Sequence, residues 1–494
     1  MAEATERGTE REPAQRDTER GPSEREATAP FPPDFAWGVT TSAYQIEGAE
    51  SVDGRGPSIW DTFSRRPGAI ANGDTGAMAA DHHARFREDV ALMARLGIRA
   101  YRFSIAWPRI QPTGTGRPLQ AGLDFYRRLL DALDDAGIEP IPVLYHWDLP
   151  QAIEDAGGWP ARDTAFRFAD YAGHVADAIG TRAARWATLN EPWCISFLGY
   201  SAGVHAPGRH EPAAAIRAVH HLLLGHGLAA ERIRASAPAS QVGIAVNLTN
   251  ARADPSADGT PLADALRRVD GLHNRLFLDP LLHGAYPADV VADLAGIGEL
   301  PVEAGDLAII STPLDWFGIN YYADRTFVAA DGPDPAIADV FPGVEGLADA
   351  PVDHPTDSGW PVTPSGLGDV LIRLAAEHPA VPPILITENG AAYDDPTGPD
   401  GSILDSRRIV YLDAHVREIA RARDAGVDVQ GYCVWSLLDN FEWAEGYAKR
   451  FGLVRVDFGS QARTPRASAG WYARLIAANG PATDRQSAPA PASD

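Results

Sequence analysis

The sequence predicts an α/β protein with a single (β/α)8 barrel (TIM barrel) and elaborated βα loops. Short β-rich runs alternate with longer helical patterns, as they do in parallel sheets that are built from βα units. Eight such runs can be counted, which is the number of strands that closes a barrel of this kind. These two observations favour one large domain over several small ones.

The predicted elements follow one another through most of the chain. Helical patterns lie between the β-rich runs, and several of them end at a glycine, which is a typical helix stop. Strands are predicted over residues 35–39, 99–105, 139–146, 185–190, 241–247, 315–322, 383–388 and 429–436. Helices are predicted over residues 81–97, 121–137, 163–180, 214–235 and 406–426.

The folded unit is predicted to cover residues 31–479. Residues 1–30 contain almost no large apolar side chain and many Glu, Arg, Thr and Pro, so they bury too little surface to offset the entropy of ordering. Residues 480–494 have the same character. Both segments are therefore predicted to be disordered tails.

Composition disfavours two classes of partner. The 494 residues include 43 Lys+Arg and 67 Asp+Glu, which gives a net charge of −24, and Lys449 is the only lysine. Binding to nucleic acid is disfavoured because a phosphate backbone is bound mainly through clustered Lys and Arg. A membrane span is disfavoured because no stretch approaches ~20 uninterrupted apolar residues.

The cysteines and the N-terminal residues favour a cytoplasmic location. Cys194 and Cys433 are too few for a disulfide scaffold in a chain of this length. The first 30 residues have mixed charges and lack the apolar core of a secretory signal.

No metal site is predicted in the histidine-rich helix 214–235. The spacings of its histidines do not align three ligands on one helix face. These histidines are His220, His221 and His226.

Polar and aromatic residues gather at the C-terminal ends of the predicted strands, where the active site of such a barrel lies. A single polar residue at a strand end usually caps a helix or lies in a solvated loop, but here six strands end in this way. Two of these residues are Glu191 and Glu388, and paired carboxylates are the groups that cleave glycosidic bonds. The strand-end residues are Arg102, His146, Trp147, Asn190, Glu191, Asn320, Tyr322, Glu388, Asn389 and Trp435.

Long segments of the chain resemble glycoside hydrolase family 1, the β-glucosidase family. The matches occur in order through nearly the whole folded unit. The resemblance implies a (β/α)8 barrel, retention of the anomeric configuration, and no metal or organic cofactor. The matching segments include FAWGVTTSAYQIEG (35–48), VLYHWDLP (143–150), TLNEPW (188–193), WFGINYY (316–322), LITENG (385–390) and GYCVWSLLDNFEWAEGYAKRFGL (431–453).

The resemblance also implies catalytic roles. Glu191 matches the acid/base and Glu388 the nucleophile. Arg102 and Tyr322 match groups that contact the nucleophile and favour its ionised form, and Asn190 resembles the donor to the sugar 2-OH. For retention the two carboxyl groups should lie ~5–5.5 Å apart, and the pKa of Glu191 should be raised so that it can donate a proton.

Further residues match the sugar-binding set of the family. Glu442 offers a carboxylate that would repel a sugar phosphate, which favours unphosphorylated substrates. Phe451 is expected to face the sugar 6-position, while Trp193 and Trp360 are expected to border the aglycone; loop 323–362 matches the family poorly. The predicted substrate-binding residues are Gln45, His146, Trp147, Asn190, Asn320, Trp435, Glu442, Trp443, Phe451, Trp360 and Trp193.

The resulting prediction is a retaining β-glucosidase that acts on small β-glucosides or cello-oligosaccharides. A transglycosylase would use the same two glutamates, and β-galactosidase or β-fucosidase could be the main activity. A non-catalytic sugar-binding barrel would lack Glu191 or Glu388, and the sequence retains both.

Overall fold

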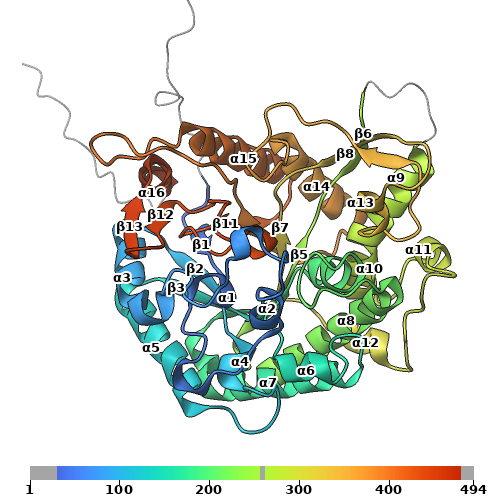
Figure 1. Ribbon diagram of the computed structural model, residues 1–494, viewed down its shortest axis with the longest axis horizontal. Helices are drawn as coiled ribbons and strands as arrows, with labels where there is room; N and C mark the ends of the chain where they lie inside the picture. Colours follow the sequence, from blue (N-terminus) through green and yellow to red (C-terminus); the bar gives the residue numbers. More distant parts are fainter. Residues whose placement is uncertain (1–30, 256–261, 480–494) are drawn as a thin grey trace, which may run out of the picture.

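The computed structural model describes residues 31–255 and 262–479, and its core is a closed barrel of eight parallel strands (Figure 1). The two predicted tails lie outside the described residues. Going round the barrel, the strands follow their order in the sequence, so each helical connection returns the chain to the neighbouring strand. The prediction of a (β/α)8 barrel is confirmed.

All eight predicted strands are present, with small differences at their ends. Around them lie the five predicted helices and several others that the sequence analysis did not single out. The barrel strands are β1 (Ala36–Thr40), β2 (Ala100–Ser104), β3 (Glu139–Tyr145), β4 (Arg185–Asn190), β5 (Gln241–Asn247), β7 (Trp316–Asn320), β10 (Ile384–Asn389) and β11 (Val429–Trp435). The predicted helices are α3 (His82–Arg95), α5 (Gln120–Ala136), α7 (Asp163–Ile179), α8 (Pro212–Ser236) and α15 (Ser406–Asp424).

The remaining helices complete the outer ring and the loops above the barrel. The longer ones are α14 (Pro364–Glu377) and α16 (Ala467–Asn479). Shorter helices are α1 (Ala43–Ile46), α2 (Ile59–Phe63), α4 (Trp107–Ile110), α6 (Gln151–Asp155), α9 (Ala263–Asp270), α10 (Leu276–His283), α11 (Ala288–Asp293), α12 (Asp306–Ile310) and α13 (Pro335–Ala338). Within residues 31–255 and 262–479, no helix has the length and apolar character needed to cross a membrane.

The inside of the barrel is apolar at its N-terminal end and polar at its C-terminal end. Successive side chains of a strand alternate between its faces, so Ala100 and Arg102 of β2 lie on the same face. Ala100 belongs to a buried apolar cluster, together with Ala187, Trp316 and Leu385 from other strands. This apolar cluster fills the inside of the barrel below the polar residues at the C-terminal ends of the strands.

Two small sheets lie outside the barrel, and the sequence analysis did not predict them. One contains β6 (Ala251–Ala253), β8 (Arg325–Ala329) and β9 (Leu347–Asp349), and Figure 1 shows β6 and β8 beside α9. The other pairs β12 (Val454–Asp457) with β13 (Ala462–Pro465). The first sheet lies largely within the segment 323–362 that matched the family poorly, so this segment has regular structure of its own.

Candidate active site

Glu191 and Glu388 reach the same cavity from different strands. Glu191 directly follows β4 and has a left-handed backbone with φ 51°, while its N–H donates to the carbonyl oxygen of Ala245 at 2.9 Å. Glu388 lies in β10, in register with Asn320 of β7. Both glutamates line a cavity of about 1050 Å³, and their exposed fractions are only 5% and 3%.

Two donors stabilise the ionised form of Glu388. A guanidinium nitrogen of Arg102 donates to Oε1 at 2.7 Å, and the Tyr322 hydroxyl donates to Oε2 at 2.8 Å. Burial raises the pKa of Glu388, and the charge of Arg102 and the hydrogen bond from Tyr322 oppose that rise. Glu388 therefore has the surroundings of a carboxylate that must be ionised to react.

Glu191 is in a different environment. Its Oε1 accepts a hydrogen bond of 2.7 Å from the neutral side-chain amide of Asn320. Burial, followed by the negative charge of Glu388, raises the pKa of Glu191 to about 7. At neutral pH Glu191 thus holds a proton for a substantial part of the time, as a general acid requires.

A hydrogen-bond network fixes the Asn190 side chain behind the two glutamates. Its oxygen accepts from Arg102 at 2.6 Å and from Asn320 at 3.0 Å, while its nitrogen donates to Nε2 of His146 at 3.2 Å. Burial, followed by the charge of Arg102, lowers the pKa of His146 well below its usual range. The imidazole is therefore neutral and can accept this bond.

Glu442 and its neighbours form the polar end of the cavity. Burial, with the charge of Glu388 as the next cause, raises the pKa of Glu442 to about 8. Gln45 is fully buried behind Glu442, where its amide nitrogen donates to the Phe441 carbonyl oxygen at 3.0 Å. Trp443 packs against Trp147 with 4.5 Å between ring centroids.

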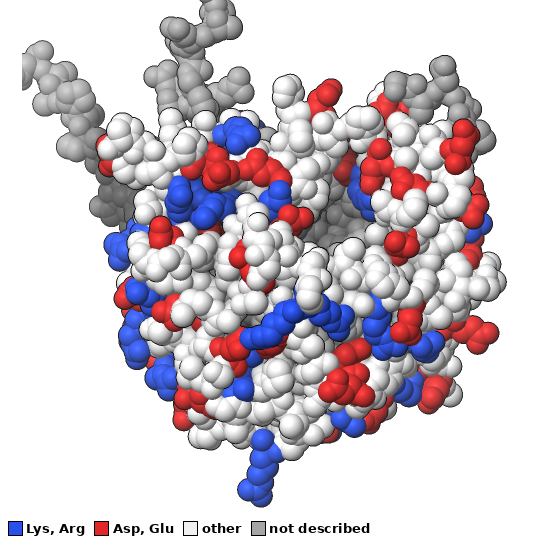
Figure 2. All heavy atoms as spheres, viewed as in Figure 1, with Lys and Arg blue, Asp and Glu red and all other residues white. Residues whose placement is uncertain are grey.

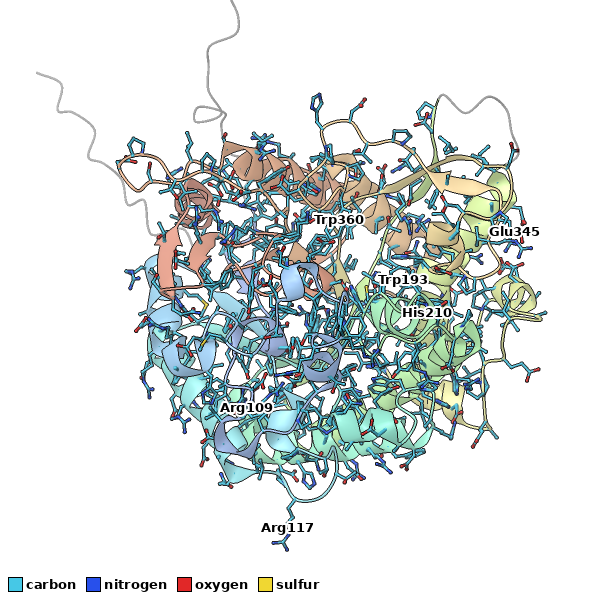
Figure 3. All side chains as sticks on the ribbon, in the orientation of Figure 1. Arg109, Arg117, Trp193, His210, Glu345 and Trp360 are labelled. Atoms are coloured by element: carbon cyan, nitrogen blue, oxygen red, sulfur yellow. The ribbon has the colours of Figure 1, made fainter. Side chains whose placement is uncertain are left out.

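Aromatic residues form another part of the wall, and they differ in how far they are exposed. Trp435 packs with Phe451, whose ring lies 6.1 Å from those of Tyr322 and Trp360. Trp360 is 39% exposed, whereas Trp193 is 6% exposed. Figure 3 labels both tryptophans around the middle of the view, where Figure 2 shows the surface to be hollowed.

Most of the predicted site residues lie on this one cavity. Arg102, Asn190 and Gln45 are buried behind its wall, and Asn389 donates instead to the carbonyl oxygen of Tyr321. The predicted residues that line the cavity are His146, Trp147, Glu191, Trp193, Asn320, Tyr322, Trp360, Glu388, Trp435, Glu442, Trp443 and Phe451.

The cavity also contains residues that the sequence analysis missed. Asn247 ends β5 and donates to Nε2 of His273 at 3.3 Å. Asn247 could have been found, because it is a polar residue at a strand end like the others. Arg325 and Asp349 come from the small sheet and form an ion pair of 2.8 Å, and no pattern in the sequence pointed to them.

The histidines of α8 have separate partners, and no common site holds them. Nε2 of His220 contacts Asp306 at 2.9 Å, His221 contacts the Trp159 carbonyl oxygen at 3.0 Å, and His226 contacts the Thr188 hydroxyl at 2.7 Å. These three contacts connect α8 to the segments that carry Asp306, Trp159 and Thr188.

A (β/α)8 barrel with two glutamates in one cavity at its C-terminal end is the arrangement found in many glycoside hydrolases. Such enzymes use a pair of carboxyl groups with different protonation states, and in a (β/α)8 barrel these groups stand at the C-terminal ends of strands. Residues 27–481 match the model of glycosyl hydrolase family 1. The chain belongs to this family.

Similar proteins include several β-glucosidases. Thermostable β-glucosidase B of Thermobispora bispora is 49% identical over 91% of each chain. The bifunctional β-D-glucosidase/β-D-fucosidase of Bifidobacterium breve is 46% identical over 90% of this chain and 98% of its own. The structure of the psychrophilic β-glucosidase from Micrococcus antarcticus has a TM-score of 0.87 and 47% identity, covering 92% of this chain and 98% of that one.

Proposed function

We propose that residues 31–479 form a retaining β-glucosidase that releases the terminal non-reducing glucosyl residue from unphosphorylated β-glucosides. The observation that carries this proposal is the contrast between the two glutamates. Glu388 accepts hydrogen bonds from Arg102 and Tyr322, whereas Glu191 contacts an amide and has a pKa of about 7. The names of the similar proteins support the same substrate class.

In the first step the Glu388 carboxylate attacks the anomeric carbon and Glu191 donates its proton to the glycosidic oxygen. The bond between these two substrate atoms breaks, and the aglycone leaves as an alcohol. Glu388 is then a neutral ester, so the pKa of Glu191 falls because a neighbouring negative charge is gone. Glu191 can now take a proton from water, whose oxygen attacks the anomeric carbon and frees Glu388.

Charge at the polar end of the cavity favours an unphosphorylated sugar. The Glu442 carboxyl, whose pKa is about 8 in the empty cavity, would be favoured in its ionised form by sugar hydroxyls that donate to it, and in that form it would repel a phosphate. The nearby cations have other partners: Arg450 pairs with Asp439 at 2.8 Å, and Lys449 donates to the carbonyl oxygen of Asp357. Neither cation lines the cavity in the described part of the chain.

β-Fucosidase activity is a second candidate. The Bifidobacterium breve relative is named for both activities, and the apolar Phe451 ring on the cavity wall would tolerate a sugar that lacks a 6-hydroxyl. Transfer to a sugar acceptor would use the same intermediate, and product analysis with added acceptor measures its share. The cytoplasmic location and a role in breaking down cello-oligosaccharides stay predictions.

The proposed specificity is tested by measuring kcat/KM for the p-nitrophenyl β-glycosides of glucose, galactose, fucose and mannose and for the glucoside 6-phosphate. The glucoside, alone or with the fucoside, should be the best substrate. A 6-phosphoglucoside that is hydrolysed better than the glucoside would contradict the argument from Glu442.

The pH profile should have an alkaline limb that belongs to Glu191. Glu191 must be protonated in the first step, so kcat/KM should fall as pH rises through about 7, which is its pKa. The check is kcat/KM for cellobiose across the pH range in which the protein stays folded. Glu442→Gln removes a second carboxyl with a raised pKa, of about 8, and leaves Glu191 in place, so the limb should stay; loss of the limb in this variant would contradict the assignment.

Glu442→Gln should lower kcat/KM for glucosides by roughly 10²-fold, because hydroxyls that donate to Glu442 favour its ionised form, whose hydrogen bonds are stronger than those of a neutral amide. Glu231→Gln is the matched control, since Glu231 is exposed on α8 and does not line the cavity. It should change kcat/KM by less than about twofold. Equal effects of the two substitutions would remove Glu442 from the sugar-binding set.

A further inference from the structure

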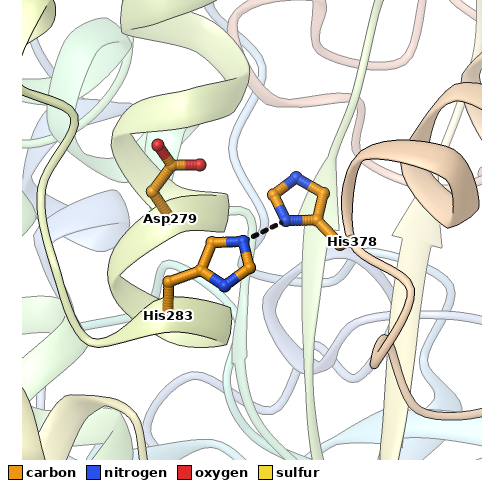
Figure 4. Close-up of side chains that lie close together, drawn as sticks. All are labelled: Asp279, His283 and His378. Atoms are coloured by element: carbon orange, nitrogen blue, oxygen red, sulfur yellow. Dashed lines mark hydrogen bonds between the residues drawn. The ribbon is translucent and has the colours of Figure 1, made fainter.

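Two histidines and an aspartate converge at a place that hydrolysis does not use. Asp279 and His283 are four residues apart on α10, which puts them on the same helix face. His378 follows the last residue of α14. One possible ligand atom from each of the three lies within 4.8 Å of the others, and Figure 4 shows the three side chains turned toward one another.

The polar atoms of this group have few partners within the protein. Nε2 of His283 and Nδ1 of His378 are 2.7 Å apart, so one ring nitrogen donates and the other accepts. Among the described residues, the half-buried Asp279 carboxylate has no hydrogen bond or ion pair, and its oxygens stay accessible to solvent. A cation could therefore reach a carboxylate that no positively charged side chain already pairs with.

The location suits a cation and is remote from the glutamates. His283 ends α10 and His378 caps the C-terminus of α14, where the helix dipole is negative and favours positive charge. β10 begins only six residues after His378, so the group lies near the N-terminal ends of the strands. Glu191 and Glu388 lie at the opposite ends.

The two imidazoles need only a small shift to hold a metal ion. Two nitrogens that bind one tetrahedral zinc at ~2.0–2.1 Å are about 3.3 Å apart, so the two rings, whose nitrogens are 2.7 Å apart, would separate by about 0.6 Å. His283 is exposed, so its ring can move and solvent can reach the ion. Two imidazoles and one carboxylate are ligands that suit Zn²⁺ better than Ca²⁺ or Mg²⁺.

We propose that Asp279, His283 and His378 bind one Zn²⁺, with water in the fourth position. The ion would link α10, which lies between β5 and β7 in the chain, to α14, which lies between β7 and β10. Its effect would be on stability, because it joins two segments of the outer ring and contacts no part of the catalytic cavity. This inference does not depend on the substrate.

The test uses tag-free protein that has been dialysed against a chelator. Titration with ZnCl₂ against a chromogenic chelator should show one equivalent bound with a micromolar Kd, and Zn²⁺ at ~100 times Kd should raise Tm by a few degrees. Ca²⁺ and Mg²⁺ should raise neither signal. kcat/KM for p-nitrophenyl β-glucoside should change by less than about twofold on adding Zn²⁺.

The matched variants are His283→Ala and Asp279→Asn. Both change side chains that are at least partly exposed, and each should weaken zinc binding by at least ~10-fold and remove the rise in Tm. His174→Ala, on α7, removes a histidine elsewhere and should bind zinc as the unchanged protein does. Unaltered binding in both cluster variants would overturn the proposal, as would zinc binding that inhibits hydrolysis and persists in His283→Ala.

Discussion

Glu388→Gln should lower kcat/KM for every β-glucoside by about 10⁵-fold or more, because the amide is a far weaker nucleophile than the carboxylate. The loss should be the same for p-nitrophenyl glucoside and for cellobiose, since a better leaving group does not replace the attacking oxygen. Steady-state kinetics on both substrates gives the measurement. Gln retains the size of Glu, so the contacts with Arg102 and Tyr322 change little in shape.

The control for this variant is Glu231→Gln, which removes the same charge from the exposed surface of α8. It should keep full activity and the same Tm. A glucoside with fluorine at C2 should form a slowly hydrolysed ester on the unchanged protein, and mass spectrometry of peptides should locate it on Glu388. A label on another residue, or more than about 1% activity in Glu388→Gln, would contradict the nucleophile assignment.

Glu191→Ala should separate substrates by their need for a proton. On cellobiose kcat/KM should fall by about 10³–10⁴-fold, because the leaving alkoxide needs protonation. On p-nitrophenyl glucoside the fall in kcat/KM should be less than about 10-fold, because nitrophenolate leaves without a proton. On cellobiose, whose leaving group needs the proton, the alkaline limb near pH 7 should also disappear, since the group with that pKa has been removed.

Asn320→Ala serves as the comparison for Glu191→Ala. It removes the amide that contacts Glu191 but keeps the carboxyl, so it should retain an alkaline limb and show no strong dependence on the leaving group. If Glu191→Ala slowed both substrates equally, Glu191 would not be the acid.

The barrel could be predicted from sequence because its pattern is local. Each strand is a short β-rich run, and most of the strands end in polar or aromatic residues that line the cavity or lie behind its wall. Glu191 and Glu388 could be placed on the cavity in this way, and the family resemblance adds the roles proposed for them. Asn247 has the same position at the end of β5, so the same sequence pattern is sufficient to predict it.

Other features could not be predicted because they depend on contacts between distant segments. The pairing of Arg325 with Asp349 requires β8 and β9 to meet, and the residues between them are so rich in Asp, Pro and Gly that their turn signals do not show which segments pair. The burial of Gln45 behind Glu442 depends on the packing of α1 against the loop after β11. The pKa of Glu191 follows from its burial and from Glu388, almost two hundred residues away.

The three-stranded sheet of β6, β8 and β9 has a consequence for how this enzyme could diversify. Arg325 and Asp349 line the cavity from this sheet, while Glu191 and Glu388 are held by the barrel. Mutations in the sheet can therefore alter the outer wall without disturbing the register of the barrel strands. If the proposed function holds, the part of the cavity that contacts the leaving group could change between related proteins, or be transferred from one protein to another, while the two glutamates stay the same.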